Sequence, residues 1–130
     1  MIDYMVPLER ISIKKELVVE CGPCQSQNEF LFNFMQEVLY VSACDPYFLP
    51  VEIEMILFDV TNRRARCKLK GEEFDLKKHG GYGTEVKAIT YSSMRIEEKE
   101  QTNIWVIVDI WMVLNEFDGF CKNLYYILLE

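Results

Sequence analysis

The sequence predicts an α+β domain, and three patterns carry that prediction. Two runs, residues 51–57 and 63–70, alternate apolar and polar residues with the period of half-buried strands. A broad apolar stripe at helical spacing extends from Phe30 to Leu39. The uninterrupted apolar run from Ile104 to Val108 is typical of a strand buried on both faces. Several strands with one long amphipathic helix indicate an α+β or mixed α/β domain.

The first half of the chain predicts one strand followed by one helix. The strand is expected over residues 11–20, with these residues on one face: Ile11, Ile13, Leu17 and Val19. The helix should start at Ser26, because Ser26 and Glu29 have the spacing of a capping box. Its apolar stripe is expected to consist of Phe30, Leu31, Phe34, Met35, Val38 and Leu39.

The middle of the chain predicts an antiparallel hairpin. Residues 51–57 are expected to place Val51, Ile53, Met55 and Leu57 inward, with Glu52 and Glu54 outward. Residues 63–70 are expected to place Ala65, Cys67 and Leu69 inward. Three glycines, Gly80, Gly81 and Gly83, mark a loop before a further strand with the sequence TEVKAITY, and 97–103 reads as a polar connector.

Composition limits the classes of function. The chain has 130 residues and 15.4 kDa, which suits one domain. Its 21 acidic and 14 basic residues give a net charge of −7, which disfavours nucleic-acid binding by bulk charge. No secretory signal and no membrane-spanning run are recognisable. An odd count of five cysteines then indicates free thiols in a reducing compartment, so we expect a cytoplasmic or nuclear location.

The pair Cys21 and Cys24 has the spacing of a thioredoxin-like dithiol, between an expected strand and an expected helix. A helix N-terminus can lower the pKa of a thiol, but the adjacent Glu20 would oppose thiolate formation. Two incidental thiols in a turn are the favoured interpretation, and a dithiol protein stays an alternative. Zinc is disfavoured, because His79, Cys44 and Cys67 do not form a second ligand pair. A lone histidine such as His79, in a Lys-Lys-His-Gly loop, is ordinarily solvated.

The segment 63–78 is locally basic. It holds seven of the 14 basic residues and three acids, and 7 − 3 gives about +4 against −11 for the remainder. The basic residues of one strand face are Arg64, Arg66, Lys68 and Lys70. A patch for phosphate or an acidic partner is one interpretation. A solvated face neutralised by Glu52 and Glu54 on the paired strand is the favoured one.

Asp109 and Lys87 are the two most informative single residues. Asp109 ends a run that should be buried, where a carboxylate is costly unless it is paired, hydrogen-bonded or metal-bound. Its ordinary interpretation is a strand-terminal side chain that reaches water. Lys87 is a cation between Val86 and Ala88 in an otherwise apolar stretch. Its ordinary interpretation is an outward strand position.

These residues together resemble the archease family. The resemblance rests on Lys78-His79, the string GTEVKAITYSSM at 83–94 and the ending VIVDI at 106–110, and it extends to about Val18. It implies a small, sandwich-like mixed α/β protein that is not itself an enzyme. It also implies an accessory role for the RtcB-type RNA ligase of tRNA splicing, in which the protein promotes guanylylation of the ligase and restores its activity after turnover.

The resemblance also implies site residues. Family members bind a divalent metal ion, with calcium as one candidate, through an N-terminal Asp-His-Thr-Ala-Asp motif and a terminal Asp-Ile pair. Only the second half carries over, as Asp109 and the main chain of Ile110. The resemblance also implies that Lys87, in the TEVKA string, faces the ligase, together with Glu85, Thr84 and His79. No membrane and no sequence-specific nucleic acid are expected as partners.

The chain departs from the family pattern at both ends. Residues 1–110 form the expected archease-like domain, which lacks the opening strand–helix unit, and 111–130 form an atypical extension. With one carboxylate and one carbonyl, a metal site should be weak. A missing strand exposes a sheet edge. The tail either packs there through residues such as Phe117, Phe120, Leu124, Tyr125, Ile127 and Leu128, or is disordered. A non-functional isoform is a further alternative.

Overall fold

The computed structural model describes residues 1–81, 83–112 and 121–129, with side chains described as far as residue 110. Three short helical elements and one long helix accompany six strands in the described part. In chain order, the elements are α1 (Ile2–Met5), the 3-10 turn η1 (Leu8–Arg10), β1 (Lys15–Cys21), α2 (Gln27–Ala43), β2 (Phe48–Asp59), β3 (Arg64–Glu73), α3 (Leu76–His79), β4 (Thr84–Glu98), β5 (Thr102–Met112) and β6 (Cys121–Leu129).

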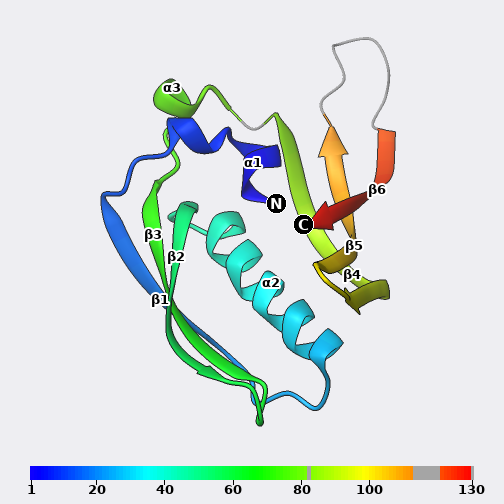
Figure 1. Ribbon diagram of the computed structural model, residues 1–130. Helices are drawn as coiled ribbons and strands as arrows, with labels where there is room; N and C mark the ends of the chain where they lie inside the picture. Colours follow the sequence, from blue (N-terminus) through cyan, green and yellow to red (C-terminus); the bar gives the residue numbers. More distant parts are fainter. Residues whose placement is uncertain (82, 113–120, 130) are drawn as a thin grey trace.

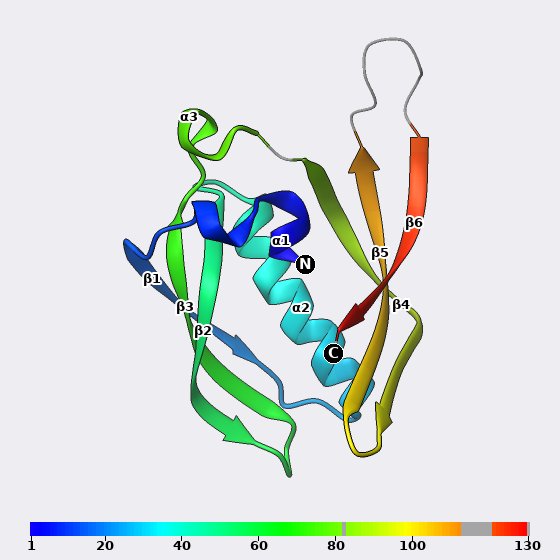
Figure 2. The ribbon, with the colours of Figure 1, turned by 45° about the horizontal axis from the view of Figure 1, so that its top comes forward.

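The strands form two three-stranded antiparallel sheets, and α2 lies between them (Figure 1, Figure 2). The first sheet has the order β1-β3-β2, and the second has the order β4-β5-β6. The two sheets and α2 enclose the apolar core, to which α1 contributes Ile2 and Met5. The expected α+β class is confirmed. None of the helices in the described part combines the length and apolar character needed to cross a bilayer.

The helix α2 begins where the capping pattern predicts. The Oγ atom of Ser26 accepts a hydrogen bond of 3.1 Å from the main-chain N–H of Glu29. The Glu29 carboxylate in turn accepts a bond of 2.7 Å from the N–H of Gln25. The first bond satisfies a donor that the first helical turn would otherwise leave unpaired, and the second pairs the N–H of the residue just before the cap. The most buried part of the predicted stripe is Met35, Val38 and Leu39.

The predicted hairpin is present, but one of its two faces differs from the prediction. β2 pairs antiparallel with β3, and Ala65, Cys67 and Leu69 are buried as expected. The expectation that Ile53, Met55 and Leu57 point into the core is wrong, because they are 44–50% exposed. β2 is an edge strand, and register shifts after Pro50 and Met55 interrupt its alternation.

The first strand is shorter than predicted. β1 begins at Lys15 rather than Ile11, and Ile13 is exposed. The main-chain N–H of Ser12 donates to the carboxylate of Glu72 at 2.8 Å instead of to a strand neighbour. A hydrogen bond to a side chain therefore replaces strand pairing at Ser12. The alternating pattern of 11–14 does not reveal this replacement.

The second sheet contains the predicted buried strand. In β5, Val106, Ile107 and Val108 are buried, whereas Ile104 and Trp105 are partly exposed. β6 pairs antiparallel with β5. Of the two alternatives for the tail, packing on a sheet edge or disorder, the described backbone of 121–129 therefore adopts the first. Phe117 and Phe120, which were expected to help cover the edge, lie outside the described residues, as do the side chains of Leu124, Tyr125, Ile127 and Leu128.

Candidate functional site

Lys87 and Asp109 come together at a β-bulge between β4 and β5. Val86 is paired with Ile110, and Ala88 is paired with Asp109, so Lys87 is the extra residue of β4. Two residues of one strand, Lys87 and Ala88, therefore oppose the single residue Asp109. Bulges of this kind redirect side chains and often lie next to functional sites.

Burial distinguishes the two faces of the sheet at this bulge. The pairs Val86–Ile110 and Ile89–Val108 are buried and point into the core. The pair between them, Ala88–Asp109, is half-buried and points to the opposite face, since side chains alternate along a strand. Lys87 is exposed. Neither charged side chain is without a partner. The outward interpretation of Lys87 is confirmed.

The other two predicted residues of this strand lie just before the bulge. Thr84 is half-buried and Glu85 is exposed, at the start of β4. The main chain enters this strand through Gly83, whose N–H donates to the carbonyl of Met5 at 3.0 Å. Thr84, Glu85 and Lys87 thus lie along one short segment of β4, and Asp109 of β5 lies next to Lys87, at the far end of that segment from Thr84.

His79 is not the solvated, partner-facing side chain that was expected, because its exposure is 0%. Its Nδ1 accepts a hydrogen bond of 2.8 Å from the N–H of Asp75, and its Nε2 lies 3.2 Å from Oε1 of Glu72. Since Nδ1 accepts, the hydrogen-bond pattern assigns the proton to Nε2, which donates to Glu72. The ring stacks on Phe74 with centroids 5.6 Å apart. His79 is therefore a buried residue that holds α3 in place through its hydrogen bonds, and its ring is not accessible to a ligase.

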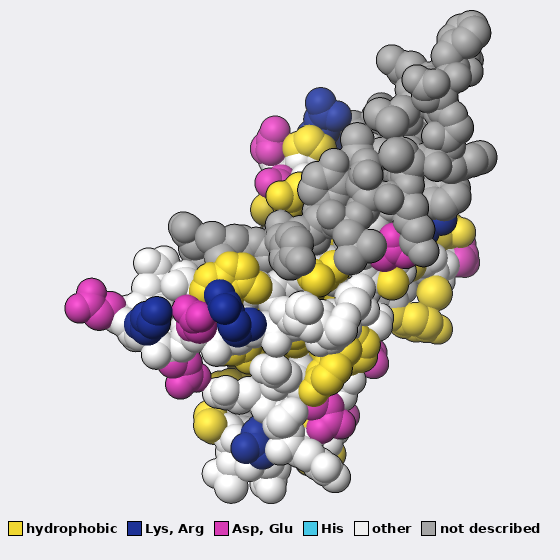
Figure 3. All heavy atoms as spheres, turned by 90° about the vertical axis from the view of Figure 1, so that its right-hand side faces the viewer, with side chains coloured by type: hydrophobic (Ala, Val, Ile, Leu, Met, Phe, Trp, Pro, Cys, Tyr) yellow, Lys and Arg dark blue, Asp and Glu magenta, His cyan; other side chains and the backbone are white. Residues whose placement is uncertain are grey.

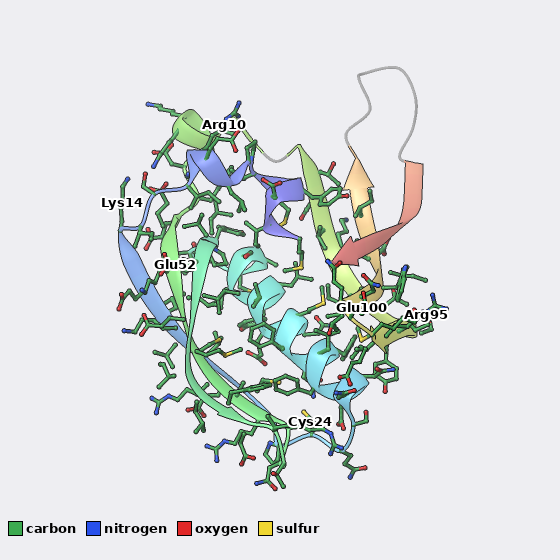
Figure 4. The ribbon with its side chains drawn as sticks, in the orientation of Figure 1. Arg10, Lys14, Cys24, Glu52, Arg95 and Glu100 are labelled. Atoms are coloured by element: carbon green, nitrogen blue, oxygen red, sulfur yellow. The ribbon has the colours of Figure 1, made fainter. Side chains whose placement is uncertain are left out.

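Sequence reasoning missed Glu72, a buried carboxylate that is held by four neighbouring groups. Its carboxylate is 4% exposed and binds Lys14 Nζ at 2.8 Å, Lys78 Nζ, the N–H of Ser12 and His79. Burial alone would raise the pKa of Glu72, but these hydrogen bonds together hold it well below its ordinary value. Figure 4 shows Lys14, with Arg10 nearby, at the end of the molecule that carries α3.

The described residues do not fit a resident divalent ion. No group of three or more His, Cys, Asp or Glu side chains within 1–81 and 83–110 is placed to hold a metal. Asp109 supplies one carboxylate, and the main chain of Ile110 has register partners on both sides, Val86 and Asn123. Hard divalent ions take six or more oxygen ligands. The expectation of a metal at Asp109 and Ile110 remains a prediction, and no step below depends on it.

The geometry around Cys21 and Cys24 does not support the dithiol alternative. Both thiols are buried, and Cys24 lies at the opposite end of the molecule from α3 (Figure 4). The Cys24 sulfur accepts a hydrogen bond from Asn33 at 3.5 Å, while Ser26 caps the helix. Burial, together with the neighbouring Cys24, raises the pKa of Cys21 to about 12, whereas a redox dithiol needs a lowered pKa.

Three of the four basic residues on this strand face are ion-paired, but Glu52 and Glu54, the predicted partners, neutralise only Lys70. Lys70 forms ion pairs with both Glu52 and Glu54 on β2, at 2.9 and 2.8 Å. Lys68 pairs with Glu16, and Arg66 pairs with Glu20, both on β1. Charges of both signs are also interspersed with apolar side chains on the face shown in Figure 3. This strand face therefore presents no unpaired basic row of Arg66, Lys68 and Lys70 to a nucleic acid.

Comparisons with known proteins agree with the resemblance. A family model described as the archease protein family matches residues 1–110. A protein archease-like of Drosophila melanogaster is 38% identical over 113 residues, covering 85% of this chain and 71% of the fly protein. A protein archease of Danio rerio is 37% identical over 110 residues, covering 85% of this chain and 67% of the fish protein.

Proposed function

Because the chain belongs to the archease family, we propose that it is an accessory protein of the RtcB-type RNA ligase in tRNA splicing. In this role it promotes guanylylation of the ligase and restores the ligase between turnovers, without being an enzyme itself. Its partner is the ligase or the complex that contains it, in the cytoplasm, the nucleus or both. The role is implied by the family, and the residues below are proposed to carry it.

The bulge that sets Lys87 beside Asp109 is the observation that supports this proposal most directly. Lys87 carries an exposed ammonium at a bulge that has β5 pairing on both sides, which suits it to contact the phosphates of GTP or an acidic surface at the nucleotide pocket of the ligase. Asp109 offers a carboxylate on the neighbouring strand. Glu85 and Thr84 extend the same contact surface toward the start of β4.

The test is guanylylation of the ligase with and without this protein. We expect Lys87→Glu to reduce the stimulation by about tenfold or more, equivalent to a loss of about 1.4 kcal/mol, because it reverses a charge at the contact. Asp109→Asn should reduce it as well. Because Lys87 is exposed, its variant should change the free energy of unfolding by no more than about 0.5 kcal/mol.

Lys99→Glu is the matched control. Lys99 is a lysine at the other end of the β4–β5 hairpin, 73% exposed and ion-paired with Glu97. Its variant should stimulate like the unchanged protein. Equal stimulation by all three variants would remove Lys87 and Asp109 from the mechanism. No stimulation by the unchanged protein would contradict the function itself.

A further inference from the structure

An open pocket of about 450 Å³ lies where the start of α2 meets both sheets. In Figure 2 the start of α2 lies next to the turn that joins β4 and β5. The apolar side chains of the lining come from α2, from the end of β2 with the turn after it, and from the β4–β5 hairpin: Phe30, Leu31, Phe58, Val60, Ile96 and Ile104. Pockets that bind small molecules have volumes of about 300–1,000 Å³ and mostly apolar walls, so this pocket has the size and composition of a ligand site.

The polar side chains of the same lining carry one positive charge. They are Gln25, Ser26, Gln27 and Arg63. No aspartate or glutamate is among the described residues that line the pocket, although the whole chain has a net charge of −7. Two glutamates lie nearby, and both are bound by groups at the start of α2. The Glu29 carboxylate accepts from the N–H of Gln25 at 2.7 Å, and the Glu98 carboxylate accepts from Gln27 Nε2 at 3.0 Å. The charge on the pocket wall therefore favours a bound anion.

Arg63 differs from the other basic residues of its neighbourhood in two ways. Its side chain is half-buried, and it forms no ion pair with any residue of the described part of the chain. By contrast, the basic residues farther along β3 are all ion-paired: Arg66, Lys68 and Lys70. The φ angle of Arg63 is +49°, in the left-handed region that favours glycine and asparagine and costs other residues free energy. A strained residue that makes no ion pair of its own indicates a functional requirement.

We infer that this pocket binds a small monocarboxylic acid with an apolar body, such as a medium-chain fatty acid. The body lies against the apolar walls, where Phe58 and Ile104 remove it from water. The carboxylate pairs with the guanidinium of Arg63, whose planar fork suits two parallel hydrogen bonds to a carboxylate. A monoanion matches the single charge of the lining, whereas a phosphate dianion would keep one charge unmatched. A neutral apolar molecule would leave the half-buried guanidinium without a partner.

The inference is independent of the proposed contact with the ligase. No residue of the pocket lining belongs to that contact surface. On β4 the pocket uses Ile96, near the end of the strand, whereas Thr84 and Lys87 lie near its start. Ligand binding and stimulation of the ligase should therefore respond to different substitutions, and either can fail without the other.

Titration of the full chain with sodium octanoate, followed by heteronuclear NMR, tests the inference. We expect saturable binding with a Kd of about 1 mM or tighter, as a ligand of this size allows. The main-chain amide signals that shift should include those of Arg63, Ile96 and Ile104. Octanamide has the same body without the charge, and it should bind about tenfold more weakly. An absence of saturable octanoate binding, or equal binding of the acid and the amide, overturns the inference.

Two neighbouring arginines provide a matched pair of variants. Arg63→Gln removes the charge that lines the pocket, and it should weaken octanoate binding by about tenfold while changing octanamide binding by less than about twofold. Arg64→Gln is the control, because Arg64 is exposed and does not line the pocket, and it should leave both affinities unchanged. Equal weakening by the two variants would reduce the effect to net charge and would overturn the inference.

A second pair of variants tests the apolar wall. Val60 lines the pocket and is 69% exposed, so Val60→Glu should retain the fold and repel octanoate from the pocket. Met55→Glu is its control, since Met55 is 50% exposed on β2 but is not part of the lining, and it should bind octanoate as before. Circular dichroism of each variant verifies the fold. If Arg63→Gln reduced stimulation of the ligase but bound octanoate normally, Arg63 would contact the partner protein instead, and the inference would be wrong.

Discussion

Glu72 and Lys87 are both charges next to apolar surroundings, yet the fold treats them in opposite ways. The Glu72 carboxylate is 4% exposed and is held by groups from the segment before β1 and from α3. Lys87 projects from a bulge and is exposed. Removing a buried charge leaves the groups that were paired with it unsatisfied, which destabilises the fold. An exposed charge is accessible to a partner protein, so the loss of Glu72 should affect stability and the loss of Lys87 should affect binding.

The largest expected effect on stability is the replacement of Glu72. Glu72→Gln removes the charge from several hydrogen bonds, and we expect it to lower the free energy of unfolding by about 2 kcal/mol. Glu73→Gln is the control, since this neighbouring carboxylate is 44% exposed and pairs with Lys15 at the surface. It should cost less than about 1 kcal/mol. Urea denaturation measures both values, and equal losses would contradict the contrast between the two glutamates.

Acid should reduce the stability that the Glu72 carboxylate contributes, over a predictable range of pH. The folded pKa of Glu72 lies below its ordinary value of 4.5, so the carboxylate stabilises the fold fully above that pH. The contribution is lost as the pH falls through the folded pKa. The gap in melting temperature between the unchanged protein and Glu72→Gln should therefore be constant from about pH 7 to about pH 5 and narrow below. A difference in melting temperature that widens in acid would show that the pKa of Glu72 is raised by folding, not lowered.

A divalent ion should have the smallest effect. Because Asp109 is one carboxylate without further described ligands, about 1 mM Ca²⁺ should shift the melting temperature by less than about 1 °C. Calorimetric titration provides the direct measurement, with Asp109→Asn as the control. Binding in the micromolar range that this variant abolishes would contradict the prediction and would place further ligands outside the described side chains.

Local patterns predicted the elements well, because each depends on neighbours in the chain. Ser26 and Glu29 identified the start of α2, and the alternation around Cys67 identified a buried strand face. The same kind of pattern failed for Ile53 and Met55. Alternation shows which residues share a face, but not whether another element covers that face. On an edge strand, nothing in the described part covers it fully.

The candidate site was predicted in part. Lys87 and Asp109 were recognised as unusual because each interrupts an apolar run. That they lie at one bulge depends on how β4 pairs with β5. Glu72 was missed because a glutamate in GEEFD has no local signal of burial, and its donors come from Ser12, Lys14 and His79, up to 60 residues away in the chain.

The sequence by itself determined the types of the elements, the hairpin, the helix cap and the strings that resemble a known family, because these depend on periodicity and on residues close in the chain. Only the tertiary structure decided that His79 is internal, that Glu72 is satisfied, that β2 is an edge and that a lysine and an aspartate meet across two strands. Burial and strand order depend on contacts between distant segments, and no local pattern specifies which segments will meet.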